Sequence, residues 1–134
     1  MPEACVVDTD VVSFLYKRDT RAEQFRPYLD EGTPLVSFMT VAELEQWTLS
    51  RGWGARRRQD LVAFLGRFSV VMVDRQLCRR WAEAANSARR SGWPILVADA
   101  WIAATALALD LPLVTNNRAD FAGVAGLRLA PAER

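Results

Sequence analysis

The chain has 134 residues, of which 51% are hydrophobic, and its 17 basic residues nearly balance its 16 acidic ones. This length predicts one domain, residues 1–134, and the apolar content is enough for a buried core and too high for a disordered chain. Because the sequence has no histidine, Ser-His-Asp catalysis and typical zinc sites are excluded, and any chemistry must rest on carboxylates, hydroxyls or a cation held by oxygen.

The predicted elements alternate between strand and helix along the chain. Short apolar runs predict strands at residues 4–7, 35–38, 69–73 and 113–114, with a short edge strand at 127–129. Helical patterns start at residue 8 or 9 and run to 17, then cover 21–29, 40–50, 55–68, 75–90 and 95–109. This alternation predicts an α/β fold with a mostly parallel sheet and helices on both of its faces.

Two acids in the first third of the chain follow predicted strands. Asp8 stands at the carboxyl end of the first strand, where parallel sheets bind ligands. It also has the position of a helix N-cap. Glu43 follows the second strand and has, with Thr40, the spacing of a capping box. Each acid therefore has a structural interpretation and a functional one, in which both point into one crevice at the sheet edge.

Three consecutive arginines, Arg56, Arg57 and Arg58, open the predicted helix that follows. Cations at a helix N-terminus oppose the helix dipole. We interpret them either as a solvated helix start or as contacts for phosphate groups. Trp47 and Trp53 lie close by in the sequence and fit either RNA contact or a protein interface.

The stretch ILVADAWIAATALALDLPLVTNNRADF is the most unusual part of the chain. Its first half is apolar on most faces, which predicts a buried helix, and Asp99 is the single acid within it. A short strand and the polar turn Thr115-Asn116-Asn117 follow, and Asp120 lies just beyond. Taken locally, Asp99 is a helix N-cap and Asp120 belongs to an Asx turn. With the two earlier acids in view, both are expected at the same sheet edge.

Carboxylates gathered in this way need a counter-charge. Two carboxylates about 5 Å apart repel by roughly 3 kcal/mol at an effective dielectric near 20. A divalent cation is the natural partner, and ligands that are all oxygen suit Mg²⁺ or Mn²⁺. Such a site can activate water and stabilise the oxygens around a phosphorus atom. The predicted set is Asp8, Glu43, Asp99 and Asp120.

Three segments, VVDTDVVSFL, VSFMTVAELEQW and the long stretch above, resemble PIN-domain ribonucleases, in the family's order and over nearly the whole chain. More closely, they are similar to the VapC-type toxins of bacterial toxin–antitoxin pairs. The resemblance implies a three-layer α/β/α PIN-like domain and a metal-dependent endoribonuclease. It places metal-binding acids at Asp8, Glu43, Asp99 and the more variable Asp120, with Mg²⁺ or Mn²⁺ held mainly by Asp8 and Asp99. It also implies that the polar turn of Thr115, Asn116 and Asn117 supports the last acid.

The resemblance also implies partners. The substrates of such toxins are structured RNAs, the toxins are usually homodimers, and a small cognate antitoxin silences each one by placing its tail in the active-site groove.

The cellular location follows from apolar runs and cysteines. No apolar run reaches the roughly 20 residues of a membrane span, and the start MPEACVVDTD lacks the features of a signal peptide. Cys5 and Cys78 lie in apolar segments, and we expect both to be buried thiols in a reducing compartment. We therefore expect a cytoplasmic protein without a membrane segment.

Two other functions fit parts of the sequence. Asp8-Thr9-Asp10 after an apolar strand resembles the start of haloacid-dehalogenase-type phosphatases, with Asp8 as nucleophile and Asp10 as general acid. That family also needs a well-placed later lysine, and Lys17, the only lysine, comes too early. The other alternative is a non-catalytic PIN-like module that binds RNA or protein, against which the retained acids argue.

Overall fold

The computed structural model describes residues 4–30 and 32–131. Its five strands form one sheet in the order β3-β2-β1-β4-β5, and all four pairings are parallel. The predicted parallel sheet is confirmed, although the third strand is two residues shorter than expected. The strands are β1 (Cys5–Val7), β2 (Pro34–Ser37), β3 (Ser69–Val71), β4 (Leu113–Val114) and β5 (Leu129–Ala130).

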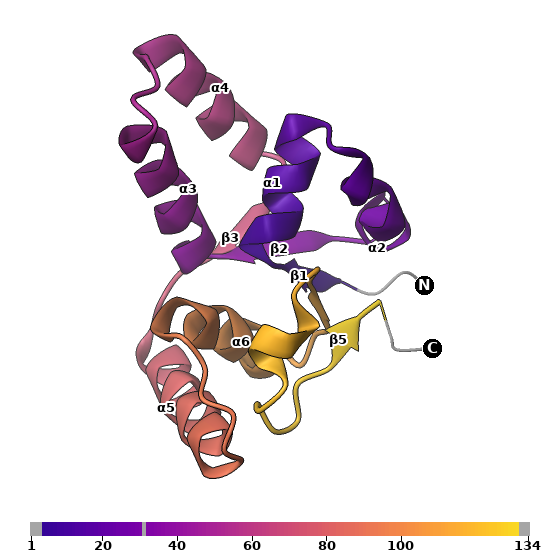
Figure 1. The fold of residues 1–134 in the computed structure, drawn as a ribbon, viewed down its shortest axis with the longest axis vertical. Coiled ribbons are helices and arrows are strands. Elements are labelled where there is room, and N and C mark those ends of the chain that lie inside the picture. The colour runs from indigo at the N-terminus through magenta and orange to yellow at the C-terminus, as the bar shows by residue number, and fades with distance from the viewer. Residues whose placement is uncertain (1–3, 31, 132–134) are drawn as a thin grey trace.

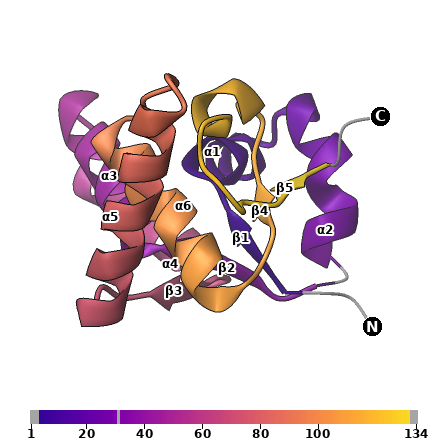
Figure 2. The ribbon, with the colours of Figure 1, turned by 90° about the horizontal axis from the view of Figure 1, so that it is seen from below.

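Helices cover both faces of this sheet. Helices α1 to α4 lie on one side of the strands, and α5 and α6 lie on the other (Figure 1). Seen from below, α5 and α6 pass in front of the strands (Figure 2). The predicted three-layer α/β/α arrangement is therefore confirmed. The helices are α1 (Thr9–Lys17), the 3-10 helix η1 (Thr20–Phe25), α2 (Arg26–Asp30), α3 (Phe38–Ser50), α4 (Ala55–Leu65), α5 (Arg75–Arg90), α6 (Val97–Leu109) and the 3-10 helix η2 (Arg118–Phe121).

Strand β1 is central because its side chains are buried on both faces. Val6 packs with the residues of α5 and α6, whereas Cys5 and Val7 pack with those of α1 and α4. All three are at most 2% exposed. Since successive strand residues point to opposite faces, a run of three apolar residues is what a strand between two helical layers requires.

Two helices start at other residues than the sequence predicts, and in both cases an acid predicted to take part in capping the helix does not do so. Helix α3 begins at Phe38, because the Ser37 hydroxyl accepts a 3.0 Å hydrogen bond from the Met39 N–H and acts as the N-cap. The capping box predicted for Thr40 and Glu43 is therefore wrong. Helix α6 begins at Val97 with Leu96 as N-cap, so Asp99 lies inside the first turn and does not cap the helix.

Three further expectations are corrected by the structure. Residues 21–29 form a 3-10 helix and a short α-helix in place of one continuous helix. The helix predicted at 55–68 ends at Leu65, and Val62 on it is 55% exposed. Cys5 is buried as predicted, but Cys78 is exposed, because it lies on the outer face of α5. Within the described part of the chain, no helix has the length and apolar character needed to cross a bilayer.

The turn η2 packs against the segment that follows α5. The indole N–H of Trp93 donates a 3.0 Å hydrogen bond to the carbonyl of Ala119. Gly123, just after η2, passes so close to this segment that a Cβ would lie 2.5 Å from the Trp93 carbonyl oxygen and 2.8 Å from the Ser91 hydroxyl. Only glycine fits this contact, and the contact positions the turn that carries Asp120.

Gly123→Ala should therefore lower the free energy of unfolding by about 1–3 kcal/mol, the usual cost of overpacking. The measurement is chemical denaturation of both proteins. Gly54→Ala is the matched control, because nothing lies within 4 Å of a Cβ at Gly54, and there only a weaker N-cap is expected, below about 1 kcal/mol. Equal stability of the two variants would show that the Trp93 contact imposes no constraint.

Candidate active site

The pairing of β1 with β4 brings Asp8 next to Thr115. Val7 pairs with Val114, and the Asp8 N–H donates to the Val114 carbonyl at 2.9 Å, so the next residues of the two strands emerge side by side. The Thr115 hydroxyl donates a 2.7 Å hydrogen bond to Asp8 Oδ2, between residues 107 positions apart in the chain. The Thr9 N–H donates to Asp8 Oδ1 at 2.8 Å. Asp8, only 5% exposed, is thus both the N-cap of α1 and a buried acid at the sheet edge.

A short chain of hydroxyls orients Glu43. The Thr9 hydroxyl lies 2.7 Å from Glu43 Oε1 and 2.9 Å from the buried Thr40 hydroxyl. A carboxylate only accepts and a threonine has a single O–H, so Thr9 donates to Glu43 and Thr40 donates to Thr9. Thr40 and Glu43 are thus joined through α1, and not through the end of α3 as a capping box would join them.

Asp10 is a site residue that the sequence analysis used only for the phosphatase alternative. Its Oδ2 accepts a 2.9 Å hydrogen bond from the Asn117 side-chain amide, and its Oδ1 accepts one of 2.7 Å from the Val11 N–H. A backbone hydrogen bond from Asn116 also lowers the pKa of this carboxyl group. The signal was present in the sequence, since Asp10 lies in the first turn of a helix whose N-cap is Asp8.

The polar turn after β4 therefore acts mainly on the first two acids. Thr115 contacts Asp8, and its hydroxyl accepts a 3.0 Å bond from the Asn117 N–H. The link from this turn to Asp120 runs through the backbone, where the Asp120 N–H donates to the Asn117 carbonyl at 3.1 Å. The Asn116 side chain makes a longer contact of 3.5 Å with Gln24.

Charge repulsion shows that the remaining acids share this site. Partial burial is the main cause that raises the pKa of Asp99 to about 6. The charges of Asp120, Glu43 and Asp10 raise it further, in that order. Asp120 itself is exposed on η2. The charges of Asp10, Glu43 and Asp120 thus act on Asp99, and the charge of Asp10 acts on Asp8, so the five acids lie in one region beside the carboxyl ends of β1 and β4.

Asp8 and Asp10 are two carboxyl groups close enough for their charges to repel each other. Burial raises the pKa of Asp8 well above its ordinary value, and the charge of Asp10 raises it further. Burial also raises the pKa of Asp10. No ion pair between described residues reaches any acid of the cluster. The charge of the cluster is therefore uncompensated by the described part of the protein.

These residues suit a hard divalent cation. The donors are all oxygens, and the hydrogen bonds to Asp8 leave lone pairs on both of its carboxylate oxygens. Within residues 4–30 and 32–131, no three acids are already gathered closely enough to hold an ion. A cation would have to draw the carboxylates inward or be held partly through water, which Mg²⁺ tolerates well.

The predicted arginine run lies outside this cluster. The Arg57 guanidinium carbon is 3.9 Å from the ring centroid of Trp53. Arg58 lines a separate small groove with Glu45, and Arg56 is exposed. None of the three lines the groove that holds Asp10 and Glu43.

Comparisons with known proteins point to one protein family. The model of the PIN domain family matches residues 5–127. Ribonuclease VapC1 of Haemophilus influenzae is 27% identical, covering 92% of this chain and 93% of the relative. The tRNA(fMet)-specific endonuclease VapC of Shigella flexneri is also 27% identical, with the same coverage. The crystal structure of DNA-bound VapBC from Salmonella typhimurium has a TM-score of 0.79 and 26% identity, over 96% of this chain and 97% of that one.

The raised carboxyl pKa values predict an unusual dependence of stability on pH. A group whose pKa is raised on folding favours the folded state while it is protonated, and this contribution is lost as pH rises through the folded pKa. For Asp99 this stabilising contribution is lost as the pH rises from about 4 to about 6. Metal-free protein should therefore melt at a lower temperature at pH 7.5 than at pH 5, and Asp99→Asn should reduce the difference and raise the melting temperature at pH 7.5.

Differential scanning calorimetry with a chelator present measures this effect, and added Mg²⁺ should stabilise the wild type at pH 7.5 more than the variant. Asp60→Asn, which removes an exposed acid of α4 outside the cluster, is the control. A lower melting temperature for Asp99→Asn at pH 7.5 would contradict the uncompensated charge.

Proposed function

The chain belongs to the PIN domain family, and from this premise we propose that its five clustered acids hold the cation at which RNA is cut. From its similarity to the VapC relatives, the chain is an endoribonuclease, the toxin of a type II toxin–antitoxin pair. The observation that supports the proposed site most strongly is the buried Asp8, which two hydrogen bonds orient toward a cluster of uncompensated carboxylates. The family match argues against a phosphatase, and the ribonuclease activity named for the relatives argues against a non-catalytic binding module.

The metal is Mg²⁺ or Mn²⁺ in this proposal, because every donor is a hard oxygen. Asp8 and Asp99 would hold it, with Glu43, Asp120 and Asp10 completing the shell directly or through water. When bound, such an ion stabilises charge on the phosphate oxygens and makes water a better nucleophile at neutral pH.

The remaining residues of the site position these acids. Thr115 and the Thr9 backbone hold both oxygens of Asp8 in one orientation, which limits the rearrangement that ion binding would require. The Thr9 hydroxyl does the same for Glu43, and the Asn117 amide for Asp10. Each hydroxyl or amide donates to the charged form of the acid, which favours the ionised state that a metal needs.

The substrate in this proposal is a structured RNA. One relative carries tRNA(fMet) in its name, and a transfer RNA presents single-stranded loops beside rigid helices, which proteins recognise by shape. Because such RNAs are cytosolic, we place the protein in the cytoplasm.

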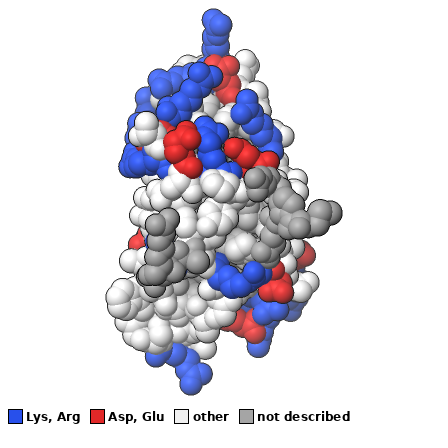
Figure 3. All heavy atoms as spheres, turned by 90° about the vertical axis from the view of Figure 1, so that its right-hand side faces the viewer, with Lys and Arg blue, Asp and Glu red and all other residues white. Residues whose placement is uncertain are grey.

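The antitoxin is the expected protein partner, since the solved relative is a VapBC complex. We propose that it docks in the groove of about 820 Å³ between α1, α2 and α4. None of the five acids lines this groove, so it would hold the part of the antitoxin outside the tail that is expected at the active site. Charged side chains of both signs gather over the upper part of the molecule, where these helices lie (Figure 3). An apolar floor with a charged rim suits an amphipathic helix. The floor includes Leu15, Leu29 and Phe64, and the rim includes Arg18, Arg26, Asp30 and Arg67.

A homodimer is proposed from exposed apolar residues beside the site. In the segment before and into α6, Trp93, Leu96 and Val97 are 56%, 73% and 65% exposed. Single exposed apolar residues are ordinary, but three within five positions favour a contact surface. Val97 is two residues from Asp99, so a second copy bound here would lie next to the acids.

Asp8→Asn and Asp99→Asn should each lower the rate of RNA cleavage at least about 100-fold while the fold survives, because each removes a proposed ligand of the ion. Asp10→Asn should lower the rate by about 10-fold to 100-fold, as expected for a supporting group. The assay is cleavage of bulk transfer RNA by purified protein, with circular dichroism to check folding. A chelator should abolish wild-type cleavage and excess Mg²⁺ or Mn²⁺ should restore it, whereas Asp60→Asn should leave the rate unchanged. Undiminished cutting in chelator would exclude the metal site.

Leu96→Ser combined with Val97→Ser should convert a dimer to a monomer in sedimentation velocity at micromolar concentration. Leu96 is the N-cap of α6 and makes no side-chain cap bond, and serine is a favoured N-cap, so the monomer itself should not be destabilised. Leu109→Ser, at the other end of α6 and 41% exposed, is the control and should stay dimeric. A double variant with unchanged mass would place any dimer contact elsewhere.

A further inference from the structure

A groove of about 450 Å³ leads away from the acids between α1 and α3. Asp10 and Glu43 line its inner part, and Lys17, Trp47 and Arg51 line it too. Lys17 is the last residue of α1, and Arg51 is the C-cap of α3. The groove therefore joins the acidic cluster to a pair of cations at two helix C-termini.

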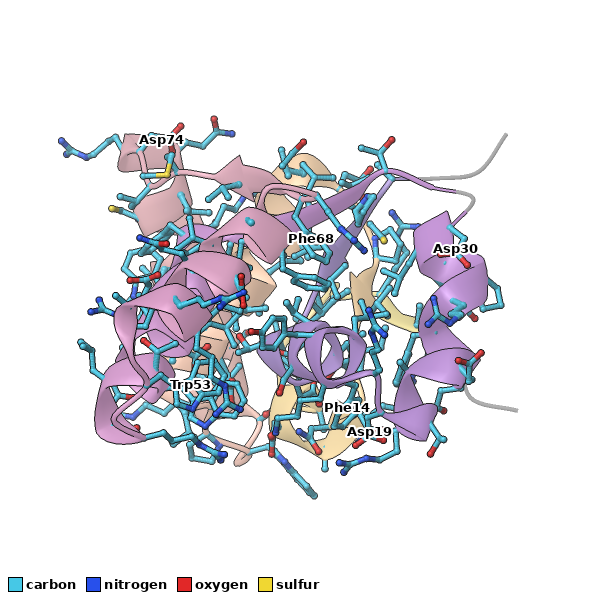
Figure 4. The ribbon with its side chains drawn as sticks, turned by 90° about the horizontal axis from the view of Figure 1, so that it is seen from above. Phe14, Asp19, Asp30, Trp53, Phe68 and Asp74 are labelled. Atoms are coloured by element: carbon cyan, nitrogen blue, oxygen red, sulfur yellow. The ribbon has the colours of Figure 1, made fainter. Side chains whose placement is uncertain are left out.

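Both cations rest on one aromatic ring. The Lys17 ammonium lies 4.5 Å and the Arg51 guanidinium carbon 4.3 Å from the ring centroid of Trp47. The ring of Trp53 lies 5.2 Å from that of Trp47 and carries Arg57. The labelled Trp53 lies among side chains at the end of the α3–α4 pair, beside α1 (Figure 4).

These cations keep their charge available. Among described residues, Arg21, Arg26, Arg80 and Arg128 pair with carboxylates. No ion pair within that part of the chain involves Lys17, Arg51 or Arg57. A ring attracts a cation by about 0.5–1 kcal/mol at an exposed site, which favours one orientation without neutralising the charge. The two groove cations are thus positioned for an external anion.

We propose that one flank of the RNA substrate lies in this groove, with Lys17 and Arg51 contacting the phosphates next to the one that is cut. The inference rests on the proposed ribonuclease function and names the residues that hold its substrate. Trp47 is a positioning residue in this arrangement. With both cations resting on its ring, it holds them in place and does not stack on a base.

The order of charges along the groove favours RNA over an acidic protein segment. The groove includes the carboxylates of Asp10 and Glu43, which no ion pair between described residues reaches and which would repel an anion until a divalent ion neutralised them. A polyphosphate chain would be attracted at both ends of the groove, because one phosphate would contact the ion while the neighbouring phosphates would contact the cations. Isolated acidic side chains of a protein have no such regular spacing.

Lys17→Gln combined with Arg51→Gln tests this site in the full-length protein. We expect KM for cleavage of bulk transfer RNA to rise about tenfold, with kcat within twofold of the wild type, because the cations bind flanking phosphates and not the reacting one. Removing two phosphate contacts should also make the slope of log K against log salt shallower by about 1.4 for single-stranded RNA. Arg89→Gln combined with Arg90→Gln, at the end of α5, removes the same charge elsewhere and should change neither KM nor the salt slope.

The salt slope is measured by RNA binding in an Asp99→Asn background, so that the groove is tested whether or not cleavage occurs. A wild type that cuts no RNA would refute the proposed function, and the binding slopes would still decide the groove. A wild type that cuts RNA while the double variant keeps its KM and slope would overturn the groove alone. Loss of antitoxin binding with RNA binding unchanged would make the groove a protein-docking surface and would also overturn it.

Trp47→Leu separates positioning from charge. Both cations remain, so the salt slope should stay near that of the wild type, while KM rises by less than in the double variant. A slope as shallow as that of the double variant would show that the ring does more than orient the cations.

Discussion

Repulsion among carboxylates at one edge of a parallel sheet is the constraint on which the rest of this structure depends. Asp8 is buried, Asp10 follows it within one helical turn, and the other acids are close enough to raise the pKa of Asp99. Such a cluster opposes folding, since ionised groups that repel one another are held together. The surrounding fold has to provide the free energy that holds them, and the central strand β1, buried on both faces, contributes to it.

Small hydroxyl residues make this cluster specific. Thr115, Thr9 and Thr40 each have one proton to donate, and the distances assign every donor to an acid or to the next hydroxyl. These bonds orient the acids and leave lone pairs open. A lysine or arginine in their place would neutralise the cluster and stabilise the fold, but it would also remove the attraction for a cation. The protein thus retains a local instability that a bound cation would relieve.

The basic residues are arranged in a complementary way. Most ion pairs given by the structure lie on exposed helix surfaces, where they contribute little. The cations that line the same groove as Asp10 and Glu43 rest on Trp47 and form no ion pair with these acids. The VapC relatives share the fold at this level of identity, whereas the groove of Lys17, Trp47 and Arg51 is argued from this chain alone.

The sequence by itself determined the alternation of strands and helices, the buried character of α6, and the positions of Asp8 at a strand end and of Asp99 near a helix start, because periodicity and composition are local properties. Only the tertiary structure decided which groups meet. The register of β1 against β4 places Thr115 on Asp8 across 107 residues. Ser37 caps α3 and so leaves Glu43 to Thr9, and Asp10 enters the site through Asn117. The exposure of Cys78 is likewise set by which face of α5 packs on α6. The Ser37 cap and the place of Asp10 in the first turn of α1 are local features. The contacts between distant segments have no local signal, since each depends on distances that only packing sets.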